Sequence, residues 1–374
     1  MIQGAAGSTI LACGLSLLSV AATGREQMRA VSLWGASAAI GAAAGPLVGG
    51  ALVDLTGWQG LFWIDAAIAL ACVPLTLRAV GESRDPLRPR SIDWLGTVLV
   101  ALVLAPVILA LSQGLAWGWL SAATLGCFAV AVAAAFAFVA VERRVTAPLV
   151  DLRLLRNGLL VGATLAILIS SGAVNALMYV LSLYLQNPAT LAMSPLQAGL
   201  ATLPAVAGMV VVAPLTSRIC ARFGTGPVIA TGFALTAVSF GALAFVDPSW
   251  RYRAFVLPLV GMAIGMGLSN NPASSVATTA VPTEQVGAAS GISNMARYVG
   301  AAVVTAAVAS VYASAGTGSA EELATGLSRS SLLLALLSAA AVGLAFLARR
   351  HRARHPRVVD HAAAAAAPVH TLPV

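Results

Sequence analysis

The apolar residues of this chain fall in long, continuous runs that short polar segments separate. Each run is about 20 residues long, which is the length of a helix that crosses a lipid bilayer. The runs predict membrane-spanning helices at residues 4–22, 30–52, 60–79, 93–112, 119–141, 158–186, 195–215, 226–246, 254–279, 292–313 and 329–348. Strands of a membrane barrel would instead show ten-residue segments of alternating character. The pattern therefore predicts an all-α polytopic membrane protein with about eleven transmembrane helices.

Composition supports this class and excludes others. Of 374 residues, 59% are hydrophobic and only 9% are charged, whereas an average soluble domain carries about 25% charged residues. The sequence holds no catalytic constellation, phosphate-binding loop or metal-ligand spacing, so we expect no enzyme, no cofactor and no metal site. The net charge of +8 comes from arginines near the ends of the runs, and we therefore expect a lipid bilayer rather than a nucleic acid as the partner.

The arginines also predict an orientation, because basic residues near span ends stay on the cytoplasmic side. With a cytoplasmic C-terminus, only Arg251, Arg253 and Arg329 of the 21 basic residues fall in outward connections. We expect a plasma (inner) membrane protein with its C-terminus in the cytoplasm. Eleven spans then place the N-terminus outside, although the first residues carry no positive charge. The first run reads as a helix that normally follows an odd number of others.

The second run carries a string of glycines around a proline. Gly41, Gly45 and Gly49 recur every four residues, so they share one helix face and allow another backbone to approach closely. Pro46 bends the helix because it lacks an N–H donor, and Gly50 follows the last glycine of the stripe. Taken alone, this pattern is better explained by the simple packing of small residues between helices.

The string resembles the antiporter motif on the fifth helix of proton-coupled exporters of the major facilitator superfamily. Four further stretches agree with that family in order. Gln3 and Gly4 resemble the end of its fourth-helix motif, residues 58–65 the start of its sixth helix, 93–96 the start of its seventh, and 282–300 the connection before its thirteenth. The chain thus resembles the fourteen-helix drug:proton antiporter branch, lacking the first three helices.

The resemblance implies a division of the chain into four parts. Residues 1–80 would form the remainder of the N-terminal bundle (family helices four to six), and 81–157 two inserted helices with a basic linker. Residues 158–350 would form a complete C-terminal six-helix bundle, and 351–374 a disordered cytoplasmic tail. In such transporters two bundles rock about a central site.

The glycine face of the second run is expected to contact the C-terminal bundle. We expect it to pack on the helix at 195–215, which offers Gly199 and Gly208.

Several charged residues are candidates for coupling or gating. Asp65 lies within an apolar run, where an acid is costly, so it serves either proton coupling or an interfacial structural role. Arg218 and Arg222 resemble the family's basic gate in the second bundle, although an alanine stands where the acid is expected. Arg297 reads as an arginine at the cytoplasmic end of its helix whose charge reaches the membrane surface, or as a gate partner of Glu284.

Candidates for the substrate site are the polar, aromatic and methionine side chains that interrupt otherwise Ala/Leu/Val helices. They are Trp34, Asn175, Met178, Tyr179, Tyr184, Asn270, Asn271, Asn294 and Met295. Each could instead hydrogen-bond to or pack against a neighbouring helix.

The resemblance implies a secondary active transporter that exports small amphipathic drugs or related compounds. Its partners would be a small-molecule substrate and protons, with the proton gradient as its energy source. A non-transporting membrane remnant or interaction partner is the first alternative, and an uptake carrier of the same fold is the second. We expect the chain to be an N-terminally truncated form.

Overall fold

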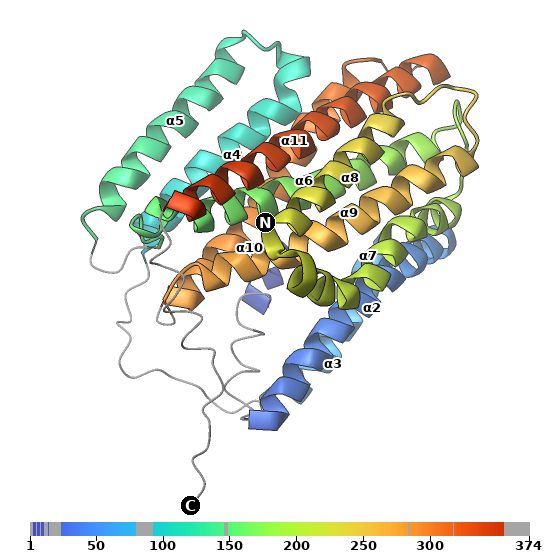
Figure 1. Cartoon of the computed structure of the whole chain (residues 1–374). Coiled ribbons are helices and arrows are strands. Elements are labelled where there is room, and N and C mark those ends of the chain that lie inside the picture. Colours follow the sequence, from blue (N-terminus) through green and yellow to red (C-terminus); the bar gives the residue numbers. More distant parts are fainter. Residues whose placement is uncertain are drawn as a thin grey trace, which may run out of the picture. The chain divides into compact units, whose positions relative to one another are not determined.

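The computed structural model describes residues 24–79, 93–145, 149–282, 285–316 and 318–354, together with Gln3, Gly4, Ala6, Gly7, Thr9, Ile10 and Gly14. These residues form helices, turns and short connections, and no strand occurs among them (Figure 1). The helices are α2 (Gly24–Thr56), α3 (Gln59–Ala79), α4 (Trp94–Trp117), α5 (Ala122–Glu142), α6 (Gly158–Gln186), α7 (Pro195–Phe223), α8 (Thr225–Leu243), α9 (Tyr252–Thr279), α10 (Val286–Ala313) and α11 (Ala320–Arg354), with one 3-10 turn at Leu154–Arg156.

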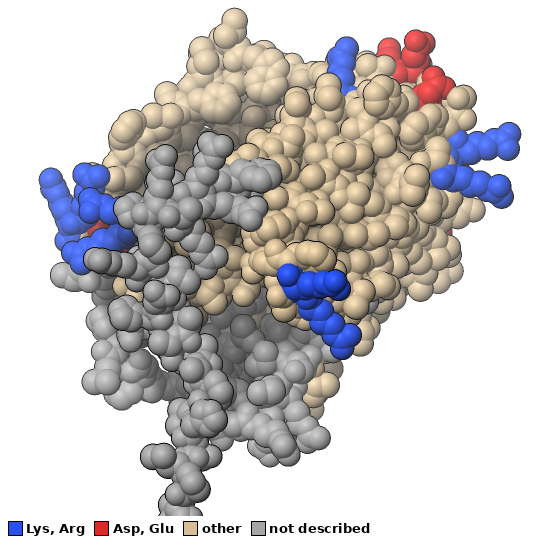
Figure 2. Space-filling model, viewed as in Figure 1, with Lys and Arg blue, Asp and Glu red and all other residues tan. Residues whose placement is uncertain are grey.

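The helices confirm the prediction of an all-α, multi-pass membrane protein. Among the described residues, eight helices are long and apolar enough to cross a membrane, and the bent α7 makes a ninth. The expected span at 30–52 lies in α2, where only Ala44–Thr56 forms a short apolar helix. The expected span at 4–22 lies mostly outside the described residues. In Figure 2 the charged side chains gather in small clusters that broad uncharged surface separates, as expected where helix sides face lipid.

Polar side chains fix where several helices begin. Asp93 accepts a hydrogen bond from the Gly96 amide at the start of α4 (2.7 Å), and Ser121 accepts one from the Thr124 amide at the start of α5 (3.2 Å). Asn157 caps α6, and its side-chain nitrogen also donates to the Ala280 carbonyl at the end of α9 (2.6 Å). Such caps satisfy amides that have no partner inside the helix.

The chain forms two compact units. The first contains residues 1–90 and 193–206, and the second contains 91–192 and 207–374. The four-part division expected from the sequence is a statement about family helices, and it stays a prediction.

In the first unit, α2 packs against the start of α7. The Asp54 carboxylate accepts hydrogen bonds from the Ser194 hydroxyl (2.9 Å) and from the Leu196 amide (3.1 Å). Gly50 is buried, and a Cβ placed on it would lie 2.7 Å from the Pro195 carbonyl oxygen. The two backbones can be this close only because position 50 carries no side chain.

The expected pairing of these two helices is therefore present, but the expected face is wrong. Position 199 contacts the Pro46 carbonyl, whereas Gly208 faces Ala263 of α9. A Cβ at Gly41 or Gly45 would meet no described atom. The contacting face contains positions 46, 50 and 54 instead. The spacing of four residues occurs on both faces, so it shows where close approach is possible without identifying the partner.

In the second unit, α6 packs against α9, α10 and α11, α8 packs against α9 and α11, and α4 pairs with α5 (Figure 1). Glycines mark the closest helix contacts. A Cβ on Gly172 of α6 would lie 2.6 Å from the Gly300 carbonyl oxygen of α10, and one on Gly232 of α8 would lie 2.6 Å from the Gly265 carbonyl oxygen of α9. Van der Waals packing of small residues thus holds these helices together, as it does in lipid generally.

Candidate functional site

An arginine on α10 is bound by two polar side chains of α9. One terminal nitrogen of Arg297 donates to the Asn270 side-chain oxygen (3.2 Å), and the other donates to the Ser274 hydroxyl oxygen (3.2 Å). The Ser274 hydroxyl in turn donates to the Asn270 backbone carbonyl (3.1 Å). Asn270 and Ser274 are one turn apart, so both face the same side of α9.

This arginine lies deep along its helix. Val286 begins α10, so eleven residues precede Arg297, which corresponds to about 16 Å at 1.5 Å per residue. Arg297 also stands one turn before Gly300, which contacts α6 at Gly172, the central residue of that helix. The helix thus extends further before Arg297 than the sequence predicted, and the interpretation of this arginine as one whose charge reaches the cytoplasmic membrane surface stays a prediction.

The difference lies at the start of α10. Small and polar residues at 286–291 lowered the hydropathy of the sequence there, so the expected span began at 292. Residues such as alanine and serine do not stop a helix, and the helix extends through them.

Arg297 has no acidic partner among the residues that the structure describes. Its only hydrogen bonds there go to the two neutral groups on α9. The expected gate partner, Glu284, lies outside the described residues, so the pairing is untested.

Further polar residues lie on exposed positions of the same two helices. Asn271 and Ser275 of α9 and Asn294 of α10 are exposed. Polar groups that faced hydrocarbon without hydrogen bonds would be costly, so such a face belongs beside a water-accessible space. We call Asn270, Asn271, Ser274, Ser275, Asn294 and Arg297 the polar face.

The polar face includes three of the predicted substrate-lining residues, namely Asn270, Asn271 and Asn294. Met295, a fourth, is 38% exposed next to them. The two serines were missed, because serine is common in membrane helices. Their signal was the spacing: each serine stands four residues after an asparagine, which places both pairs on neighbouring stripes of one helix.

The candidates on α6 lie elsewhere in the second unit. The exposed Asn175 donates to the Ser171 carbonyl of its own helix (2.9 Å), while Met178 is half-buried and Tyr179 is exposed. Tyr184 is 1% exposed, and its ring centre lies 5.8 Å from that of Phe255 on α9. Tyr184 therefore packs against a neighbouring helix, which was the alternative to a substrate-lining role.

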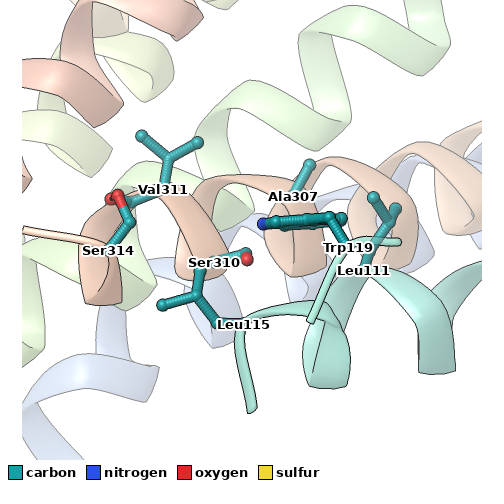
Figure 3. A pocket seen from close by; sticks show the side chains of 7 residues that line it. All are labelled: Leu111, Leu115, Trp119, Ala307, Ser310, Val311 and Ser314. Atoms are coloured by element: carbon teal, nitrogen blue, oxygen red, sulfur yellow. Dashed lines mark hydrogen bonds between the residues drawn. The ribbon is translucent and has the colours of Figure 1, made fainter. Parts of the chain in front are cut away.

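A small cavity lies between the ends of α4 and α10 (Figure 3). It measures about 280 Å³, and its lining consists of Leu111, Leu115, Trp119, Ala307, Ser310, Val311 and Ser314. The Ser310 hydroxyl is buried and has no hydrogen-bond partner among the described residues. Thirteen residues of α10 separate Ser310 from Arg297, or about 20 Å, so this cavity is distinct from the polar face.

Comparison with known proteins decides the family. A model described as Major Facilitator Superfamily matches residues 1–305. The chain belongs to the Major Facilitator Superfamily. It is 30% identical over 315 residues to the tetracenomycin C resistance and export protein of Streptomyces glaucescens, which covers 84% of this chain and 58% of that protein. It is 32% identical to the multidrug resistance protein Stp of Mycobacterium tuberculosis (83% and 57%) and 29% identical to the multidrug efflux pump LfrA of Mycolicibacterium smegmatis (83% and 61%).

The chain spans less than two thirds of the length of these curated relatives. Membership of this superfamily, rather than of an enzyme family, agrees with the expectation from composition. The resemblance to drug-resistance members is also confirmed by the names that these relatives carry.

The remaining family-based candidates lie on exposed positions. Gln3 and Gly4 are exposed and helical, and Asp65 is exposed on α3. Arg218 and Arg222 are exposed near the end of α7, where the Arg222 guanidinium carbon lies 5.4 Å from the centre of the Phe223 ring. The side chain of Trp34, a substrate-site candidate, lies outside the described positions, as does Glu284. The coupling and gating roles stay predictions.

Proposed function

We propose that this chain is part of a secondary active transporter that exports small amphipathic molecules across a plasma membrane, driven by the proton gradient. The observation that carries the proposal is the polar face, with an arginine held near the middle of helices that are otherwise apolar. An ionisable residue inside a membrane-spanning helix is costly and usually serves transport. The names of the relatives, which refer to export, efflux and resistance, support the outward direction.

The arginine distribution supports a cytoplasmic C-terminus. In that orientation the contact between Asp54 and the start of α7 lies at the outer side of the membrane. Alternating access requires one side to close while the other opens. We propose that the Asp54 contact closes the outer side, because it joins helices that the family places in different bundles.

The outer contact leads to a prediction about stability. Replacing Asp54 by alanine removes an acceptor from the Ser194 hydroxyl and from the Leu196 amide. We expect a loss of about 1–2 kcal/mol, because a helix-terminal amide and a hydroxyl lose their partner. The thermal unfolding midpoint of the purified chain measures it.

The Asp54→Asn and Ser194→Ala variants control for this effect. Asparagine keeps a side-chain oxygen, so Asp54→Asn should lower the stability less than Asp54→Ala does. The Asp54→Ala and Ser194→Ala losses should combine to less than their sum, since both substitutions remove one shared hydrogen bond. Fully additive losses would show that the contact does not stabilise the protein.

Transport itself is tested in proteoliposomes that contain the 374-residue chain. The vesicles are loaded with the amphipathic dye ethidium, and a proton gradient is imposed in either direction. We expect dye movement that opposes proton flow and stops when an uncoupler collapses the gradient. Dye movement with the proton flow would indicate uptake. Movement no faster than in protein-free vesicles would favour the non-transporting alternative, and either result would overturn the proposal for this chain.

A further inference from the structure

The charge of Arg297 is not neutralised by the groups that hold it. A guanidinium carries five N–H donors and cannot lose its proton in a protein. Two of these donors are used by Asn270 and Ser274. The other three have no acceptor among the described residues, and both partners are uncharged, so a full positive charge stays available.

The position of this charge makes an anion a favourable partner. An arginine inside a membrane-spanning helix either pairs with a negative group or faces water. The exposed Asn271, Ser275 and Asn294 indicate that the polar face borders a water-accessible space. An anion that entered this space would gain more electrostatic energy than it would in bulk water, because the surroundings are less polarisable.

The orientation of the guanidinium is fixed from one side. Asn270 and Ser274 both bind its terminal nitrogens from α9, which restricts the long side chain before any ligand arrives. The planar group then presents its remaining donors as a fork, and this geometry matches the two oxygens of a carboxylate.

Two large exposed side chains stand close to Arg297 in the sequence. On α10, Met295 is 38% exposed and Tyr298 is 51% exposed. Met295 stands two residues before Arg297 and Tyr298 directly follows it, and both offer apolar contact surface to an aromatic molecule.

We propose that the polar face binds the negatively charged group of the transported molecule, and that Arg297 forms a paired hydrogen bond with its carboxylate. The preferred substrates are thus amphipathic aromatic acids. This inference rests on the proposed function and names its substrate class. Asn270 and Ser274 are positioning residues, because they act through the guanidinium.

The test compares an acid with its neutral ester. The probes are 1-pyrenebutyrate and its methyl ester, which share one ring system and differ in charge, and their binding to the purified chain in nanodiscs is followed by fluorescence. We expect the wild-type chain to bind the acid about tenfold more tightly than the ester, since a charge-assisted pair contributes this much. Arg297→Gln should remove that preference and change the affinity for the ester less than twofold.

Three further variants sharpen the result. Arg297→Lys keeps the charge without the planar fork, so it should retain only part of the preference. Asn270→Ala should weaken the binding of the acid a few-fold and leave the binding of the ester unchanged. Arg253→Gln removes the charge of an exposed arginine at the start of α9, and it should alter neither ligand. Helical content and the thermal midpoint of each variant exclude misfolding as a cause.

Each other outcome overturns the inference. If Arg297→Gln lowered the affinity for acid and ester equally, the arginine would support the structure and not the ligand. If Glu284→Gln lowered both affinities in the same way, the two residues would form an internal ion pair. A wild-type chain that binds the ester as tightly as the acid would refute the anion site while the proposed export function stands. A chain that binds neither probe would overturn both.

Discussion

Replacing Gly300 by leucine should prevent stable packing of α6 against α10. A side chain at position 300 would overlap the Leu168 backbone carbonyl, and that carbonyl cannot move without shifting α6. Overpacking of a close helix contact costs about 3 kcal/mol or more. We expect little folded protein in detergent, with a thermal midpoint about 5 °C or more below that of the wild type. Size-exclusion chromatography after heating measures both.

The control for this experiment lies on the same helix. Gly291 is exposed, and a Cβ on it would meet no described atom. Gly291→Leu changes the helix propensity in the same way as Gly300→Leu but should leave the midpoint nearly unchanged. Equal destabilisation by the two substitutions would mean that propensity, rather than the contact with α6, determines the effect.

The second large effect is expected at Gly50. A leucine there would collide with the Pro195 carbonyl and with Leu196 at the start of α7. If the contact closes the outer side, Gly50→Leu should reduce proton-driven dye export at least about tenfold and make the vesicles leak protons. Dye efflux and the decay rate of an imposed pH gradient report these two consequences.

Gly45 provides the matched comparison within the same motif. A Cβ at Gly45 meets no described atom, so Gly45→Leu should cause a clearly smaller loss of export than Gly50→Leu. A larger loss of export in Gly45→Leu than in Gly50→Leu would show that the face with Gly41, Gly45 and Gly49 is the critical one, and not the face with positions 46, 50 and 54.

The sequence predicted the helices well because membrane insertion depends on local composition. A run of about 20 apolar residues must satisfy its backbone groups internally, and a helix does this without help from distant residues. Turns such as the one at 246–248 were also recognisable: the Asp247 carboxylate accepts a hydrogen bond from the Ser249 amide (2.9 Å). Hydrogen bonds from Ser249 hold the pKa of that carboxyl below its usual value.

The candidate site was predicted only in part, because it depends on contacts between helices. Asn270 and Arg297 were recognisable as polar interruptions of apolar runs, but nothing in either helix shows that the two meet. Ser274 was hidden because its hydroxyl can bond to its own helix, as it does. The contacting face of the glycine motif was predicted wrongly for a similar reason. The spacing of small residues shows which helix surfaces allow close approach, but it does not show which helix packs there.

The crossing of α6 and α10 at Gly172 and Gly300 has a mechanical consequence for the anion site. Any rotation of α10 about this crossing displaces each residue in proportion to its distance from the pivot. For a tilt of about 10°, Arg297, about 4.5 Å away, moves less than about 1 Å, whereas Ser310, about 15 Å away, moves about 2.6 Å. Hydrogen bonds of the length seen at Arg297 survive the smaller shift. The arginine can therefore hold its ligand while the helix ends open and close around it.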